Sequence, residues 1–307
     1  MDDRAALAAA QARSFAIAAE WRESDAYRAL TEAFDAAPPD DAEAVAEVAL
    51  RILGRPEMVT GLFDQLTAAL ADDPWFEPPF RVSRDRLRVG AALFDHPLAA
   101  ISATVMSAAA LAEMPPPASI AVSGRLALVR YVRGGGARLR LWTADPAGPD
   151  FSSDRARPAE PLGTVALADG MILRIDGRTR ATLTEGAASD VVTITVTVRV
   201  GVAPYQREYA LPGGEFVRMA TLDDGAARTQ MLLTFLRHAK RADAAPWFEA
   251  ATCDGAFFLR WSAMREWLAL DARGALPRLR AMADDPNMEV RAAAVAMLPM
   301  VEAACRA

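Results

Sequence analysis

The first part of the chain repeats its apolar residues with the period of a helix. Trp21, Leu30 and Phe34 recur at helical spacing. Apolar residues continue at this spacing up to about residue 73. Pro38-Pro39-Asp40-Asp41 interrupts the pattern, and Asp40 or Asp41 suits the N-cap of the next helix. The pattern therefore predicts an N-terminal helical segment, whose last helix begins at Pro56 and carries Met58, Leu62, Leu66 and Leu70.

The pattern changes to strand-like alternation after Asp73-Pro74. Residues 191–199 are the clearest case, because valine and isoleucine alternate there with threonine and arginine. That alternation predicts an antiparallel strand with one buried face. Gly134-Gly135-Gly136 predicts a hairpin between residues 126–133 and 137–142. We expect about eight to ten strands up to residue 222, the number and spacing of a sandwich or barrel.

The last part of the chain is helical again and contains an internal repeat. Residues 244–248 align with residues 275–279 at an offset of 31 residues. The same offset pairs Asp254-Gly255 with Asp285-Pro286 and Arg260 with Arg291. Each copy reads as a helix, a short turn and a second helix, which is typical of stacked helical hairpins.

The order of these patterns predicts an α+β protein in three segments. N-terminal helices occupy residues 1–73, an antiparallel β-sandwich or barrel residues 74–222, and helical hairpins residues 223–307. Runs of one element type followed by runs of another favour α+β over a wound parallel sheet.

The second hairpin, residues 275–294, resembles a HEAT repeat. Pro277 in the first helix, the Asp285-Pro286 turn and Val290-Arg291 with small residues after it carry the resemblance. It implies a surface that binds a protein or peptide partner. The first hairpin is rich in aromatic residues, which form either an exposed docking patch or a core. The partner-contact residues that we expect are Trp247, Phe257, Arg260 and Arg291.

The middle segment is similar to a cupin-type barrel in its strand order. The similarity lies in residues 137–142 and 209–216. It implies a barrel, but the histidines of a metal-binding cupin are missing after Trp142. We therefore expect no metal and no cofactor, which leaves a small-molecule pocket or a purely structural barrel.

Arginines gather on the strands around the glycine turn. Arg130 and Arg133 precede it, and Arg138 and Arg140 follow it. An arginine on an apolar face needs an anionic partner, whereas on a solvated face its stem covers apolar neighbours. Both interpretations stay open. Under the first, the residues that would bind a small acidic ligand are Arg130, Arg140, Trp142 and His96.

Composition narrows the class of protein. A net charge of −6 argues against nucleic-acid binding, which depends on clustered lysine and arginine. The longest uncharged stretch, residues 97–112, is too short to cross a membrane. The start of the chain lacks the basic and apolar pattern of a leader, so a cytoplasmic protein is expected. The heavy use of alanine and arginine with little lysine suggests a bacterial source.

Two functions follow from these patterns. The first is a non-enzymatic interaction, regulatory or accessory protein that uses a HEAT-like tail on a cupin-like platform. The alternative is a metal-independent cupin-type enzyme or binding protein for an acidic metabolite. No catalytic motif occurs in the sequence. We therefore leave enzymatic activity open and lean towards a protein that is not an enzyme.

Overall fold

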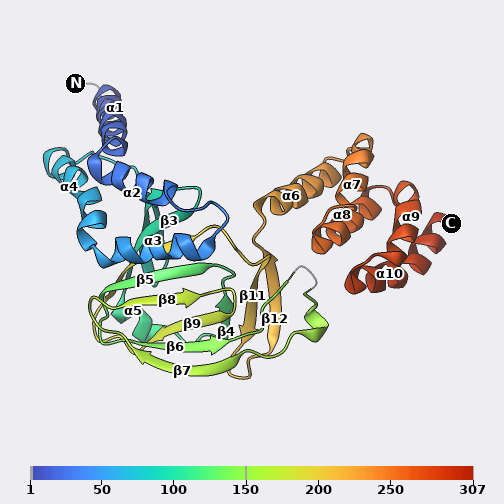
Figure 1. Cartoon of the computed structure of the whole chain (residues 1–307). Coiled ribbons are helices and arrows are strands. Elements are labelled where there is room, and N and C mark those ends of the chain that lie inside the picture. Colours follow the sequence, from blue (N-terminus) through green and yellow to red (C-terminus); the bar gives the residue numbers. More distant parts are fainter. Residues whose placement is uncertain (1–2, 149–150, 307) are drawn as a thin grey trace. The chain divides into compact units, whose positions relative to one another are not determined.

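A computed structural model describes residues 3–148 and 151–306 (Figure 1). The chain forms two compact units. We call the first the β unit; it contains Met1–Pro146, Pro158–Ala203 and Arg207–Val217. The second is the tail unit, with Ala147–Arg157, Pro204–Gln206 and Arg218–Ala307. The N-terminal helices thus share a unit with the strands, and the tail unit is assembled from three pieces of the chain.

Four helices open the β unit. Asp41 caps the third, and its side chain accepts hydrogen bonds from the backbone N–H groups of Glu43 and Ala44 at 2.9 and 3.1 Å. This helix packs on strands β5 and β10 because its apolar face, including Val45 and Ile52, is fully buried. The helices are α1 (Asp3–Arg22), α2 (Asp25–Asp35), α3 (Ala42–Gly54) and α4 (Pro56–Asp72).

The strands form two antiparallel sheets of six. The first has the order β1-β2-β3-β10-β5-β8 and the second β12-β11-β4-β9-β6-β7. Helices before and after antiparallel sheets confirm the predicted mixed organisation. The first sheet comprises β1 (Arg81–Arg84), β2 (Arg88–Asp95), β3 (Ala99–Met106), β5 (Leu126–Arg133), β8 (Ile172–Asp176) and β10 (Val191–Val198); the second comprises β4 (Ser119–Val122), β6 (Arg138–Thr143), β7 (Glu160–Ala166), β9 (Arg180–Glu185), β11 (Tyr205–Ala210) and β12 (Phe216–Thr221).

The described residues thus form twelve strands, more than the eight to ten predicted. β1 is exposed along its whole length and β7 along almost all of it. Neither strand buries a face, so neither shows the apolar alternation from which the other strands were predicted. β10 behaves as expected, because Ile194, Val196 and Val198 are buried in the core beneath the N-terminal helices.

The glycine turn at residues 134–136 does not make the predicted hairpin. β5 pairs with β10 and β8, whereas β6 pairs with β9 and β7. The turn therefore carries the chain from the first sheet to the second. Gly135 has a φ of +63°, and its carbonyl accepts hydrogen bonds from the N–H groups of Ala188 and Ser189. Such a crossing leaves the same glycine signal as a hairpin.

Replacing Gly135 with alanine is expected to destabilise the β unit by about 2–3 kcal/mol. A Cβ atom there would lie 2.2 Å from the carbonyl oxygen of Ser189. Gly186→Ala is the matched control, because Gly186 also has a positive φ but no atom within 4 Å of the added carbon. It should cost only about 1 kcal/mol, the strain of the backbone conformation. Urea unfolding of both variants measures the difference; equal losses would contradict the close approach at Gly135.

Helices build the tail unit. The second helices of the two predicted hairpins are α8 and α10. The turns that precede these two helices are held by equivalent hydrogen bonds. Arg260 Nη1 donates to the carbonyls of Asp254 and Gly255, and Arg291 Nη1 donates to those of Asp285 and Pro286. The helices are α6 (Asp224–His238), α7 (Ala245–Ala251), α8 (Phe257–Leu270), α9 (Ala272–Ala281) and α10 (Met288–Arg306).

The offset of 31 residues extends to α6. Asp223, Asp254 and Asp285 are spaced by 31, and the side chain of each accepts a hydrogen bond from the backbone N–H two residues later, where the following helix begins. α6 therefore corresponds to the second helix of an earlier layer. The tail core consists of residues from all these layers, among them Leu233, Phe248, Met264, Leu279 and Val290.

Candidate functional site

The four residues predicted to bind a small ligand do not gather at one place. Arg130 lies on the side of the first sheet that faces the helices, and its Nη1 donates to the carbonyl of Leu53 at 2.8 Å. Trp142 is 2% exposed in a core on the second sheet. Arg140 lies beside it, with its guanidinium 4.8 Å from the centre of the Trp142 ring.

His96 is held by contacts within the β unit. Its Nδ1 accepts a hydrogen bond from the backbone N–H of Leu98 at 3.2 Å, so Nε2 carries the proton of the neutral ring. Nε2 lies 3.0 Å from a carboxylate oxygen of Asp35 at the end of α2. The ring is buried and stacks on Phe34, with their centres 5.6 Å apart. These contacts tie strand β2 to α2.

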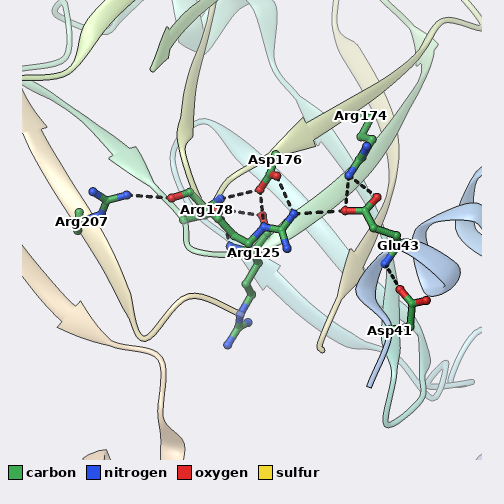
Figure 2. Close-up of polar contacts among 8 residues, drawn as sticks. Asp41, Glu43, Arg125, Arg174, Asp176, Arg178 and Arg207 are labelled. Atoms are coloured by element: carbon green, nitrogen blue, oxygen red, sulfur yellow. Dashed lines mark hydrogen bonds and ion pairs between the residues drawn. The ribbon is translucent and has the colours of Figure 1, made fainter. Parts of the chain in front are cut away.

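A charged network fastens α3 to the turn between β8 and β9 (Figure 2). Arg174 donates to both carboxylate oxygens of Glu43, at 2.7 and 2.6 Å. Arg178 donates to Asp176 and also reaches Glu43. The hydrogen bond from Arg178 lowers the pKa of Asp176 below its ordinary value. Two arginines and two carboxylates thus satisfy one another, and this network joins elements of the β unit.

A cavity of about 690 Å³ opens on the β unit. We call it the proline cleft, because the three consecutive prolines 115–117 form part of its wall. Arg88 and Arg140 line it, together with Glu185. Glu185 lies 3.7 Å from the Arg140 guanidinium. The rest of the lining comprises Leu87, Met106, Leu111, residues 114–118, Leu183, Thr184, Gly186 and residues 211–212.

A second cavity, of about 560 Å³, lies in the tail unit. We call it the tail groove. It crosses α6, α8 and α10, and three of its residues, Ala227, Phe258 and Glu289, occupy equivalent positions at the 31-residue offset. Its other lining residues are Tyr205, Met219, Ala220, Thr221, Gln230, Phe257, Trp261, Ser262, Arg265 and Val290.

A segment of the same chain contacts residues of the tail groove. Phe151 packs on Tyr205, with ring centres 6.3 Å apart. The backbone N–H and hydroxyl of Ser153 donate to one oxygen of Glu289, at 2.7 and 2.9 Å. The segment is part of the tail unit although it follows β6 in sequence. An aromatic ring and a pair of hydrogen-bond donors thus bind beside the groove.

The predicted partner-contact residues have different environments. Trp247 is 70% exposed on α7. Phe257 is buried and lines the tail groove. Arg260 is buried and donates to both carboxylate oxygens of Asp285, at 2.9 and 2.6 Å. Arg291 is exposed and binds the carbonyls of its own turn.

Several residues that line the two cavities were not predicted from the sequence. Arg88 and Glu185 are far apart in the chain and come from different sheets. Only the strand register brings them to one cleft, and register has no local signal here. Phe258 and Trp261 belong to the aromatic first hairpin, and the equivalent positions of the repeat could have pointed to them.

Neither a family model nor a curated protein sequence matches the chain. Among solved structures, it is similar to a cupin family protein with a double-stranded β-helix fold from Methanocaldococcus jannaschii, with 17% identity over 40% of this chain and 90% of that one, and a TM-score of 0.23. It is also similar to a sugar phosphate isomerase from a cupin superfamily of Silicibacter pomeroyi, with 11% identity over 47% of this chain and 87% of that one, and a TM-score of 0.23. A 7S globulin from Momordica charantia is 12% identical over 44% of this chain, with a TM-score of 0.27. The match covers only 36% of the length of that globulin.

At these identities and scores, the strand pairing described above remains the basis for the fold. Within residues 3–148 and 151–306, no three histidine, cysteine, aspartate or glutamate side chains gather as a metal site. No helix in the same ranges has both the length and the apolar character to cross a membrane.

Proposed function

We propose that the chain is an interaction protein, with a regulatory or accessory role, whose tail unit binds an extended segment of a partner protein in the tail groove. The groove itself is the main support. It crosses equivalent positions of three helical layers, as binding surfaces of stacked hairpins do. The resemblance of the second hairpin to a HEAT repeat agrees with this function. The antiparallel sheets would serve as a cupin-like platform.

The groove also suggests the chemistry of the partner segment. Phe258 and Trp261 are partly exposed there and offer aromatic faces. Arg265 is exposed and forms no ion pair within the described residues. A cation beside aromatic rings favours a segment with one aromatic and one acidic side chain. The contacts of Phe151 and Ser153 show that an irregular chain segment fits against this surface.

Panning a random peptide display library on the full-length protein tests the proposal. We expect enrichment of peptides that combine an aromatic and an acidic residue. Trp261→Ala should weaken their binding at least about tenfold, the cost of one aromatic anchor. Phe235→Ala is the control, because Phe235 is 66% exposed on α6 and lies outside the groove.

A charge reversal sharpens the test. Arg265→Glu should shift enrichment from acidic to basic peptides, because the carboxylate would repel the first class and attract the second. Arg228→Glu is the matched control on an exposed arginine of α6 outside the groove. No enrichment on the folded protein, or identical peptides from wild type and Arg265→Glu, would contradict the proposal.

A further inference from the structure

The proline cleft has a composition that is independent of the tail. Its walls are mainly leucine, methionine and proline, and its charged side chains are Arg88, Arg140 and Glu185. These charges sum to +1 (two arginines and one carboxylate). Ligand sites commonly have a volume of about 300–1,000 Å³ with apolar walls and few polar groups. The cleft, at about 690 Å³, lies within this range.

The two arginines reach the cleft from different sheets. Arg88 stands on β2 opposite Met106 of β3, in the first sheet. Arg140 stands on β6 opposite Leu183 of β9, in the second sheet. Two positive groups from separate sheets therefore border one apolar space. This placement raises the local concentration of an anion and adds a charge-assisted hydrogen bond when it binds.

Arg140 is oriented before any ligand arrives. Its guanidinium lies over the Trp142 ring at 4.8 Å, a cation–π contact that limits the conformations of the side chain. Its distance of 3.7 Å to Glu185 is longer than a close hydrogen-bonded pair. Arg88 forms no close ion pair within the described residues; the pKa of nearby Asp85 is lowered mainly by hydrogen bonds from the backbone N–H groups of Arg88 and Leu87, and to a smaller extent by the Arg88 charge. Both guanidinium groups therefore keep donors that a ligand can use.

Most of the remaining wall is apolar, and Thr184 is the polar side chain among these residues. Prolines 115–117 have no backbone N–H and so offer no hydrogen-bond donor. Met106, Leu111 and Met114 border the same space, and methionine adapts to irregular apolar shapes. α5 (Ala108–Glu113), which carries Leu111, has no buried residue in the structure. A ligand in the cleft would cover the apolar side of this helix.

We propose that the proline cleft binds an apolar molecule with a single anionic head group, which Arg88 and Arg140 contact. The apolar body lies against the prolines and methionines. This site differs from the tail groove in place and in ligand chemistry, and it does not depend on partner binding by the tail.

Isothermal titration of the full-length protein with decanoate, decyl phosphate, decanol and decyltrimethylammonium tests the site. At least one of the two anions should bind, and decanol and the cation should bind at least about tenfold more weakly, the worth of a charge-assisted contact. The better anion identifies the head group as carboxylate or phosphate. Failure of both anions to bind the folded protein, or equal binding of the cation, would overturn the proposal.

Variants assign the contact to the two arginines. Arg88→Gln and Arg140→Gln should each weaken binding of the better anion about tenfold and leave decanol unchanged. Arg138→Gln is the control, because Arg138 lies on the same strand and is exposed but does not line the cleft. Glu185→Gln should tighten anion binding. If Arg138→Gln weakens binding as much as Arg140→Gln does, the proposed contact is wrong.

Discussion

Arg260→Met is expected to destabilise the tail unit by about 3–5 kcal/mol, the cost of leaving one member of a buried ion pair alone. The side chains of Arg260 and Asp285 are 10% and 4% exposed. Arg260 binds both oxygens of Asp285 and two carbonyls of its own turn. Methionine keeps much of the length of the side chain, so the loss reports the missing donors rather than a large cavity.

Arg291→Met is the matched control for this variant. Arg291 makes the same two contacts to the carbonyls of its turn but has no ion pair within the described residues. Its replacement should cost only about 1 kcal/mol, as for an exposed hydrogen bond. Hydrogen exchange of the tail helices in urea measures both variants. Equal losses would show that the carboxylate of Asp285 contributes nothing.

The same pair predicts a dependence on pH. Burial alone would raise the pKa of Asp285, but hydrogen bonds from Arg260 and from the N–H of Asn287 outweigh it and lower the pKa. The folded protein therefore holds this carboxylate ionised more strongly than the unfolded chain does. The resulting stabilisation is complete above the unfolded pKa of about 3.9 and is lost as pH falls through the lower folded value. Arg260→Met should weaken this dependence.

Arg207→Met is expected to destabilise the β unit by a similar amount, about 3–5 kcal/mol. Arg207 is fully buried on β11. Its guanidinium donates to the carbonyls of Asp145 and Arg178, at 2.6 and 2.8 Å, and to the hydroxyl of Tyr209 at 2.9 Å. Burial lowers the pKa of Arg207. Removing the guanidinium would take its donors from the two carbonyls and from the buried Tyr209 hydroxyl (Figure 2 shows the contact with Arg178).

Two further variants separate geometry from charge at this position. Arg207→Lys should recover little of the loss, because one ammonium cannot span acceptors that the planar guanidinium reaches together. Arg180→Met, at an exposed arginine on β9 of the same sheet, should change the free energy of unfolding by less than about 0.5 kcal/mol. Urea unfolding measures all three. Full recovery with lysine would contradict a role for the three-way contact.

The elements that depend on local periodicity could be predicted from the sequence. The alternation in β10 marks its buried face, and the 31-residue offset locates the turns that Arg260 and Arg291 hold. These signals are local because each residue reports the environment of its own face. The crossing at residues 134–136 has no such signal, since a glycine turn looks the same within one sheet and between two.

The candidate sites were harder to predict because they also depend on contacts that leave no local signal in the sequence. The convergence of Arg88 and Arg140 depends on which strands pair and in what register. His96 has the residue type of a ligand contact, yet its role follows from Asp35, which lies on a helix 61 residues away. In both cases the deciding neighbour is distant in sequence, and charge or residue type alone does not identify it.

The piece of the tail unit between β6 and β7 has a consequence for how the protein can be made and divided. Residues 147–157 leave the ribosome well before the helices that they contact have been synthesised. During that interval Phe151 and Ser153 lack their final neighbours. A fragment that starts at residue 218 lacks this piece as well as Tyr205. Grafting the tail onto another protein would therefore require a circularly permuted gene or a separately supplied peptide.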